Sequence, residues 1–298
     1  MKRSIVILTE DRYENPKKKD WYIKNILEED NLLLNSLKSL GFNVVRASWS
    51  SKTFDWESVD YAIFRTTWDY FERLGEFLEW VKFYSKKIKF INDVELILWN
   101  LNKTYLQKFP KKDVVPSLFL KLNEKKSLEN IFKKTRWEKI IIKPSISAAA
   151  WNTHLVSKKN LKKFELIFSK LKKKHTMIAQ EFQSNVLIFG EVSLMVFGGK
   201  FSHAVLKKAK KNDYRVQDDY GGSVAPYNPP KKEIDFAEKI IKMCPKKPLY
   251  ARVDILFNHN KKPLLSELEI IEPELWLRFN KKSADLLAEK IFNFINRH

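Results

Sequence analysis

Three acidic side chains near the end of the chain stand where two predicted strands could bring them together. Asp254 falls inside the run LYARVDILF (249–257), and Glu267 and Glu269 fall inside PLLSELEII (263–271), with the hairpin sequence NHNKKP between them. Side chains two apart on a strand share a face, and antiparallel pairing can place both glutamates beside Asp254. Such carboxylates suit Mg²⁺ that holds nucleotide phosphates. A solvated strand face with alternating acids explains the pair equally well.

Four basic residues could bind an anion, although none is decisive by its position alone. Lys143 ends the apolar run KIIIKP, and residues 145–150 after it are small enough for backbone N–H groups to approach an anion. That stretch lacks the glycines of a P-loop, and Lys103 in NKTYL would pass as a surface lysine. Arg215 stands in a polar loop, and Arg252 lies on a strand two residues before the aspartate. A strand-interior arginine beside acids is an ion pair or an anion binder, and alone the ion pair is favoured.

The sequence lacks the residue patterns of several other kinds of active site. The five histidines show no HxxxH or HxH spacing, and no serine stands in a G-x-S-x-G motif, so a zinc site and a hydrolase triad are unsupported. The single cysteine, Cys244, cannot form an intramolecular disulfide, which agrees with a reducing compartment. The mean hydropathy is −0.40, and no apolar run approaches a membrane span. We therefore expect a cytoplasmic protein without a membrane partner.

The composition is strongly basic, with a formal net charge of +20 that invites a nucleic-acid partner. Only ten of the 56 basic residues are arginine, and the lysines gather in short runs. The runs that we expect to be exposed are 17–19, 172–174, 207–208, 231–232 and 246–247. A solvated lysine surface explains the charge better than nucleic-acid binding, which we do not expect.

The first hundred residues alternate strand and helix patterns. Predicted strands cover 4–9, 43–48 and 61–66, and predicted helices cover 22–40 and 74–86. This alternation is typical of a small parallel sheet with crossover helices, in which ligands lie at the carboxyl ends of the strands. Residues 9–12 and 65–70 are therefore candidate binding loops.

The rest of the chain mixes short helices with antiparallel strands. We expect β structure from Val186 onwards, with a turn at Gly198 and Gly199, and a mobile stretch at 209–230. Further helices are predicted at 94–99, 103–109, 128–134, 158–174, 234–243 and 283–296, and further strands at 117–121, 139–144, 177–182, 249–257 and 263–271. No internal repeat is present.

Taken in order, these motifs resemble the ATP-grasp superfamily of carboxylate ligases. The resemblance runs through NKTYL, IIKP, AQEF, GEVS, DYRVQDDYGG, ARVD and ELEIIEP, and covers nearly the whole chain. It is similar to the glutathione-synthetase-like and ribosomal-protein-glutamate-ligase-like branch, and RTTWDY with LWNLNKTYL resembles the group that contains the D-cycloserine-forming ligase. The implied fold is α/β: an N-terminal parallel-sheet domain (1–100), then a central lobe (101–183) and a C-terminal lobe (184–298) that clasp ATP.

The resemblance also implies residue roles. Lys103 and Lys143, with Ser147 in the small-residue loop, match the grip on the nucleotide phosphates; Glu181 and Phe182 match the adenine hinge; Glu191 matches the ribose acid. Asp254, Glu267 and Glu269 match the magnesium ligands. Relatives often have Asn at the last of these positions. Because Glu269 adds a negative charge there, we expect two metal ions. Arg215 and Arg252 match the arginines that neutralise the γ-phosphate and the developing oxyanion.

The resemblance implies the substrate-binding residues less directly than the nucleotide-binding residues. Substrate should meet the N-terminal domain at Arg65, Thr66, Thr67 and Asp69, where Arg65 could pair a carboxylate. A structural turn, with Trp68 packed and Asp69 capping, explains RTTWDY as well. Residues 210–226, with Gly221 and Gly222 as flexible positions next to substrate, are the expected lid. The glycine-free loop SISAAAWNT departs from glycine-rich relatives and puts tight closure over ATP in question.

We therefore predict an ATP- and Mg²⁺-dependent ligase that activates a carboxylate of an amino-acid-like molecule as an acyl phosphate for attack by an amine. Intramolecular ring closure is one form of this reaction. Two alternatives stay open: a ligase acting on a peptide or protein, and a non-catalytic nucleotide-binding protein. The partners would be small-molecule carboxylate and amine substrates, and a homo-oligomer is open.

Overall fold

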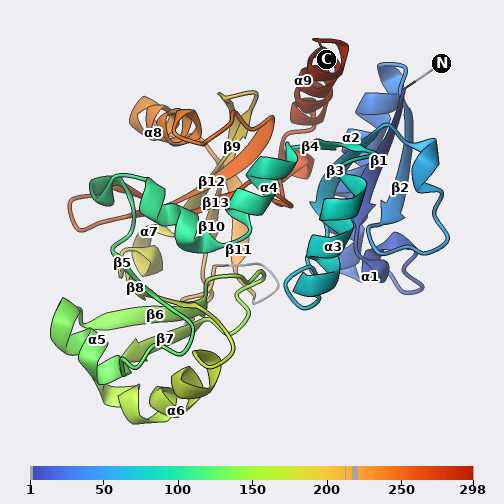
Figure 1. The fold of residues 1–298 in the computed structure, drawn as a ribbon. Helices are drawn as coiled ribbons and strands as arrows, with labels where there is room; N and C mark the ends of the chain where they lie inside the picture. Colours follow the sequence, from blue (N-terminus) through green and yellow to red (C-terminus); the bar gives the residue numbers. More distant parts are fainter. Residues whose placement is uncertain (1–2, 212, 217–220, 298) are drawn as a thin grey trace.

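The computed structural model describes residues 3–211, 213–216 and 221–297, which form three sheets, each in its own part of the molecule (Figure 1). Each sheet lies inside one of the three predicted sequence ranges. The lobe limits themselves stay a prediction.

The N-terminal sheet is parallel throughout and has the order β2-β1-β3-β4. Its elements are β1 (Ser4–Thr9), α1 (Asp11–Glu14), α2 (Trp21–Ser39), β2 (Asn43–Ser48), β3 (Tyr61–Thr66), α3 (Leu74–Tyr84) and β4 (Lys89–Ile91). Strand β1 is buried at every position, as expected for a central strand with helices on both faces. The predicted strands and helices are confirmed. Strand β4 was missed because a three-residue strand, here Lys89 with two apolar residues, is too short to show a periodicity.

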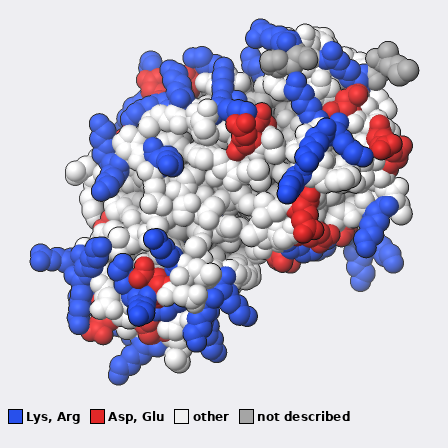
Figure 2. All heavy atoms as spheres, in the orientation of Figure 1, with Lys and Arg blue, Asp and Glu red and all other residues white. Residues whose placement is uncertain are grey.

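The central lobe carries an antiparallel sheet of order β5-β8-β6-β7. Its elements are β5 (Ser117–Leu120), α5 (Leu128–Thr135), β6 (Lys139–Pro144), β7 (His154–Ser157), α6 (Leu161–Leu171) and β8 (Met177–Glu181). The apolar faces of both helices pack on this sheet, where Ile131 and Phe168 are fully buried. The basic side chains of this lobe point outward and are dense at the lower left of Figure 2.

The C-terminal lobe carries the largest sheet, of order β11-β10-β9-β12-β13. Its elements are α7 (Val186–Phe189), β9 (Glu191–Phe197), β10 (Lys200–Lys208), β11 (Ser223–Tyr227), α8 (Lys231–Lys242), β12 (Tyr250–Phe257), β13 (Pro263–Glu269) and α9 (Lys282–Arg297). Helix α4 (Val94–Asn100) and the single-turn segment Lys103–Lys108 pack on the same sheet, through Leu96, Tyr105 and Leu106.

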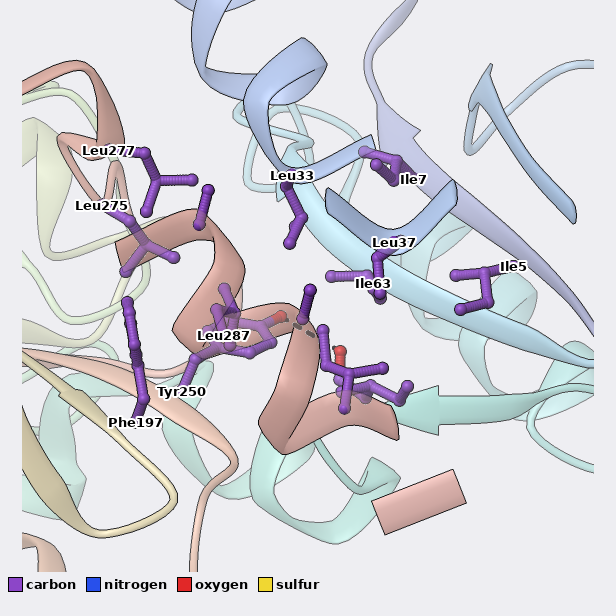
Figure 3. Packing of buried hydrophobic residues seen from close by; sticks show 14 of the residues in the cluster. Ile5, Ile7, Leu33, Leu37, Ile63, Phe197, Tyr250, Leu275, Leu277 and Leu287 are labelled. Carbon is purple, nitrogen blue, oxygen red and sulfur yellow. Dashed lines mark hydrogen bonds between the residues drawn. The ribbon is translucent and has the colours of Figure 1, made fainter. Parts of the chain in front are cut away.

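The last helix packs against the N-terminal domain. Helix α9 packs against α2, and one apolar cluster runs from the N-terminal sheet to the C-terminal sheet (Figure 3). In this cluster Leu33 and Leu37 of α2 meet Leu287 of α9, and Leu275 and Leu277 lie at one end. The N-terminal domain is therefore anchored to the C-terminal lobe. Within the described residues, no helix is long and apolar enough to cross a membrane.

Two expectations about secondary structure were wrong. Residues 186–189 form the helix α7 rather than a strand, because a four-residue apolar run fits either element. Gly190 ends that helix at φ +84°, where a Cβ atom would lie 2.3 Å from the Lys207 carbonyl oxygen. Residues 223–227, expected to be mobile, pair with β10 as β11. Strand β7 occupies residues 154–157, for which no element was predicted.

Candidate functional site

Two adjoining cavities lie between the central and C-terminal sheets, with volumes of about 220 Å³ and about 100 Å³. They share the lining residues Lys143, Ala150, Thr153, Glu191 and Ser266. The predicted site residues on the larger cavity are Lys103, Lys143, Ser147, Glu191, Arg252, Asp254, Glu267 and Glu269. Those on the smaller cavity are Lys143, Glu181, Phe182, Glu191 and Arg215. The structure thus gathers the predicted nucleotide, metal and catalytic residues around one continuous space.

The pairing of β12 with β13 brings the acids and Arg252 together. Asp254 lies opposite Glu267, and Arg252 lies opposite Glu269. The Arg252 guanidinium donates to Asp254 at 3.0 Å from Nε and 2.9 Å from Nη2, and it also donates to Glu269. Burial acts to raise the pKa of Asp254, but Arg252 and Lys207 outweigh it and hold that pKa at about 2. The predicted ion pair of Arg252 is therefore present inside the cavity.

The two predicted phosphate lysines converge on one carboxylate. Lys103 Nζ lies 3.1 Å from Glu267 Oε1, and Lys143 Nζ lies 3.8 Å from Glu267 Oε2. Burial acts to raise the pKa of Glu267, yet the two lysines hold it below its usual range. Burial lowers the pKa of Lys143 in spite of Glu267. These cations are desolvated and close together, which favours binding of a multiply charged anion.

Lys207 is a site residue that the sequence reasoning placed on an exposed surface, and that expectation was wrong. The side chain is buried on β10, opposite Glu191 in the register with β9. Its Nζ contacts Glu191 and lies 3.6 Å from Asp254 Oδ2, under the ring of Trp276. Burial acts to lower the pKa of Lys207, but the two acids raise it overall. The other predicted lysine runs are exposed or half-buried.

The small-residue loop after β6 contains no glycine, and three of its residues adopt the left-handed backbone conformation that glycine usually provides. Ala149, Ala150 and Asn152 have φ values of +47°, +52° and +49°, a region in which glycine is normally found. Such strain is typical of ligand-binding loops. The hydroxyl of Tyr214, from the predicted lid, donates to the Thr153 carbonyl at 3.0 Å, and Lys103 Nζ donates to the Ser147 carbonyl. The loop, the lid and a phosphate lysine are thus already in contact.

The predicted adenine hinge lines the smaller cavity, but its amides are engaged. The N–H of Glu181 donates to Pro116 at 2.8 Å, and that of Phe182 donates to Lys139 at 3.1 Å. These two amides are therefore not free to donate to a ligand, and Glu181 and Phe182 remain lining residues of the smaller cavity. Arg215, on the same cavity, is paired to Asp213 at 2.9 Å.

The predicted substrate residues of the N-terminal domain lie outside both cavities. The buried Arg65 donates to the Pro273 carbonyl at 2.7 Å, and Thr66 bonds Thr9 at 2.6 Å. Asp69 accepts from the Trp49 indole at 2.8 Å, and Thr67 is fully buried. These contacts favour the structural-turn alternative, although Asp69 caps no helix with its side chain. Gly221 and Gly222 also lie off both cavities, and lid residues 212 and 217–220 lie outside the described residues.

Several lining residues of the larger cavity were missed. They are Tyr22, Asn100, Tyr105, Lys207, Glu272, Glu274 and Trp276, whereas Trp68 and Tyr70, which also line it, belong to the predicted binding loop 65–70. The acids Glu272 and Glu274 flank Pro273 and repeat the spacing of Glu267 and Glu269 one residue out of phase, and this second acidic pair was the signal available. The missed aromatic residues come from three distant segments, and only the tertiary fold assembles them.

The donor chemistry fits magnesium, although the residues do not preassemble a metal centre. Among the residues that the structure describes, no three His, Cys, Asp or Glu side chains converge closely enough to hold a metal ion. Mg²⁺ is usually held by one or two carboxylates and completes its shell with water and substrate phosphates. Burial, with Asp254 and Glu267 nearby, raises the pKa of Glu269 to about 8 against the effect of Arg252. A bound cation would relieve this excess of acid.

The architecture defines the class: two antiparallel lobes around a basic and acidic cavity, after a parallel N-terminal domain, are the ATP-grasp fold. D-alanine–D-alanine ligase from Bacillus anthracis, complexed with ATP, superposes with a TM-score of 0.67 at 14% identity, over 98% of this chain and 96% of that chain. The ATP-grasp ligase PsnB, complexed with a variant of its minimal precursor, Mg and ADP, gives 0.62 at 12% identity, over 97% and 98%.

The chain is also similar to D-cycloserine synthetase, DcsG. Residues 5–92 match the family model of the N-terminal domain of that enzyme. The cycloserine biosynthesis protein DcsG of Streptomyces lavendulae is 23% identical over 291 residues, covering 87% of this chain and 92% of the relative. The crystal structure of D-cycloserine synthetase superposes with a TM-score of 0.85 at 19% identity, over 97% of this chain and 98% of that chain. The predicted fold and the resemblance to the ATP-grasp ligases near DcsG are confirmed.

Proposed function

We propose that the protein is an ATP-dependent carboxylate–amine ligase that activates an amino-acid-like substrate as an acyl phosphate. One observation carries the proposal: four desolvated cations and the three carboxylates of the predicted metal set line the same cavity, next to a smaller cavity at the hinge. The cations are Lys103, Lys143, Lys207 and Arg252, and the carboxylates are Asp254, Glu267 and Glu269. A non-catalytic nucleotide-binding protein would not need Arg252 and all three acids.

ATP would lie across both cavities, which meet at Lys143 and Glu191. The Glu181 and Phe182 side chains would contact adenine in the smaller cavity, and Glu191 would accept from ribose hydroxyls. Lys103 and Lys143, with the strained loop at Ser147, would hold the phosphates in the larger cavity. Mg²⁺, held by Asp254, Glu267 and Glu269, would neutralise phosphate charge when bound; we propose two ions.

The proposed chemistry has two steps that need cations. A substrate carboxylate oxygen attacks the γ-phosphorus, the bond to the β-phosphate oxygen breaks, and ADP leaves. An amine then attacks the acyl carbon and inorganic phosphate leaves. Arg252, held in place by Asp254 and Glu269, would stabilise the charge that develops in both transition states, together with Arg215 from the lid side. The Tyr214 bond to Thr153 would help to exclude water from the acyl phosphate.

The similarity to a D-cycloserine synthetase favours a small amino-acid derivative, with ring closure by a nucleophile of the same molecule. PsnB, which is complexed with a peptide precursor, supports a peptide substrate as the second candidate. The basic surface of Figure 2 would attract an acidic peptide.

The test is ADP release from Mg-ATP across a panel of amino acids, small dicarboxylates and acidic peptides, with hydroxylamine to trap acyl phosphate as hydroxamate. We expect substrate-dependent ADP together with hydroxamate from the wild type. ATP binding with neither product across the whole panel would favour the non-catalytic alternative.

A further inference from the structure

Six lining residues of the larger cavity come from α2, the turn after β3 or the segment after β13, and none of them belongs to the phosphate grip or the predicted metal set. They are Tyr22, Trp68, Tyr70, Glu272, Glu274 and Trp276, and none of them lines the smaller cavity at the hinge. Three come from the N-terminal domain and three from the segment that follows β13. This group, which we call the acceptor wall, therefore lies on the side of the cavity that faces the N-terminal domain.

The backbone of this segment is fixed from both sides. The carbonyl of Glu272 accepts from the Trp68 indole at 3.0 Å, and that of Pro273 accepts from Arg65 at 2.7 Å. The carbonyl of Leu275 bonds His203 Nε2 at 2.8 Å. Because successive carbonyls are held by side chains from separate elements, the acceptor wall is a rigid surface. Rigid walls with polar groups are suited to selecting one ligand geometry.

Glu272 stands out by its charge. The other acids on the cavity each form an ion pair: Glu191 with Lys207, Asp254 and Glu269 with Arg252, Glu267 with Lys103, and Glu274 with Arg278. Glu272 is 8% exposed, and no described cation lies within 4 Å of its carboxylate; the charge of Lys103, which pairs with Glu267, acts on it from farther away. Its carboxylate is hydrogen-bonded by the neutral Tyr70 hydroxyl. A buried carboxylate without a contacting cation is costly unless a ligand supplies one.

The surroundings of Glu272 favour an organic cation. Trp68 and Tyr22 lie on the same wall with ring centroids 6.2 Å apart, and aromatic faces attract ammonium groups but give no oxygen ligand to a metal. The indole Nε1 of Trp276 is buried and has no hydrogen-bond partner among the residues that the structure describes, and Trp276 has the left-handed φ of +46°. An indole N–H can only donate, so it would take an oxygen of the same ligand.

We infer that Glu272 is a specificity-determining residue that binds the ammonium group of the substrate, flanked by Trp68 and Tyr22. The inference rests on the proposed function and narrows it: the activated carboxylate belongs to a molecule that carries a free amino group. A molecule with a hydroxyl in place of the amino group would leave Glu272 without its cation.

The experiment compares amino acids of both hands with their hydroxy-acid counterparts, such as alanine with lactate and serine with glycerate. ADP and hydroxamate formation give kcat/KM, and calorimetry with the Mg complex of a non-hydrolysable ATP analogue gives binding. We expect the wild type to favour an amino acid over its counterpart by roughly 10- to 100-fold, the range of a charge-assisted hydrogen bond. Glu272→Gln should reduce this ratio to near one, and Glu272→Asp, which keeps the charge, should retain part of it.

Glu233→Gln is the matched control, because Glu233 is also a buried glutamate bonded to a tyrosine, Tyr227, but lies off both cavities. It should keep the wild-type ratio. Equal use of amino and hydroxy acids by the wild type, or an unchanged ratio in Glu272→Gln, would overturn the inference and leave the ligase function standing. Binding that depends on Glu272 without turnover would support the ammonium site and overturn the ligase function. Neither binding nor turnover with any pair would overturn both.

Discussion

Replacing Lys207 by Met should destabilise the protein, because this buried lysine pairs with two acids. The ammonium group is buried, contacts Glu191 and lies 3.6 Å from Asp254 Oδ2. At that distance the Coulomb attraction to Asp254 alone is about 5 kcal/mol at an effective dielectric constant of about 20. Much of it is offset by desolvation, but removing the lysine leaves Glu191 without its cation in the interior. Breaking a buried pair in this way costs about 3–5 kcal/mol.

The assay is thermal unfolding in the absence of nucleotide. A loss of about 3–5 kcal/mol should lower the Tm by roughly 10 °C. Lys208→Met is the matched control, because Lys208 is the exposed neighbour on the same strand, and it should change the Tm by less than about 2 °C. Adding Glu191→Gln to Lys207→Met should restore part of the loss, since it removes an unpaired charge. A Tm for Lys207→Met within about 2 °C of wild type would refute the argument that Lys207 compensates buried acids.

Three further predictions follow from other residues. Glu267→Gln should abolish hydroxamate formation even at temperatures where the variant is fully folded, because it removes a proposed metal ligand; its Tm should also fall, since the buried Lys103 and Lys143 lose their shared carboxylate, and wild-type activity would contradict the metal assignment. His203 has a pKa lowered by burial to about 4 against 6.5 when unfolded, so stability should be full above pH 6.5 and fall by up to about 3 kcal/mol towards pH 4, a loss that His203→Gln should lessen in pH-dependent unfolding. Gly190→Ala should cost at least about 2 kcal/mol by denaturant unfolding, since its Cβ would meet the Lys207 carbonyl oxygen at 2.3 Å, whereas Gly41→Ala, with open space around it, should cost only about 1 kcal/mol; equal effects would contradict the steric reason.

The strongest sequence predictions were those carried by local patterns. The helix α2 and the pairing of the strands that carry Asp254 and Glu267 were predicted from residues close together in the sequence, and the structure contains both. The order of the motifs predicted that site residues between 103 and 269 lie together, which no single motif predicts. The structure places those residues around the two adjoining cavities. The buried position of Lys207 could not be predicted, because two adjacent lysines form the same sequence pattern on an exposed strand and on a buried one.

The acceptor side was predictable only in part, for a related reason. Arg65 ends a strand of the right kind, but its hydrogen-bond partner is Pro273, more than two hundred residues away. The side chains of the acceptor wall come from α2, from the turn after β3 and from the segment after β13. Their meeting depends on how the N-terminal domain docks on the C-terminal lobe through α2 and α9. A pattern in one segment carries no information about that docking.

The proposed function requires transfer of the γ-phosphate to a substrate carboxylate. The most direct test of this transfer is turnover of the substrate identified by the panel, labelled with ¹⁸O in the carboxylate, followed by mass analysis of the released phosphate. We expect one ¹⁸O atom in each phosphate, because the bridging oxygen of the acyl phosphate comes from the carboxylate and leaves with the phosphate. Unlabelled phosphate from a turning-over enzyme would contradict carboxylate activation and the proposed function with it.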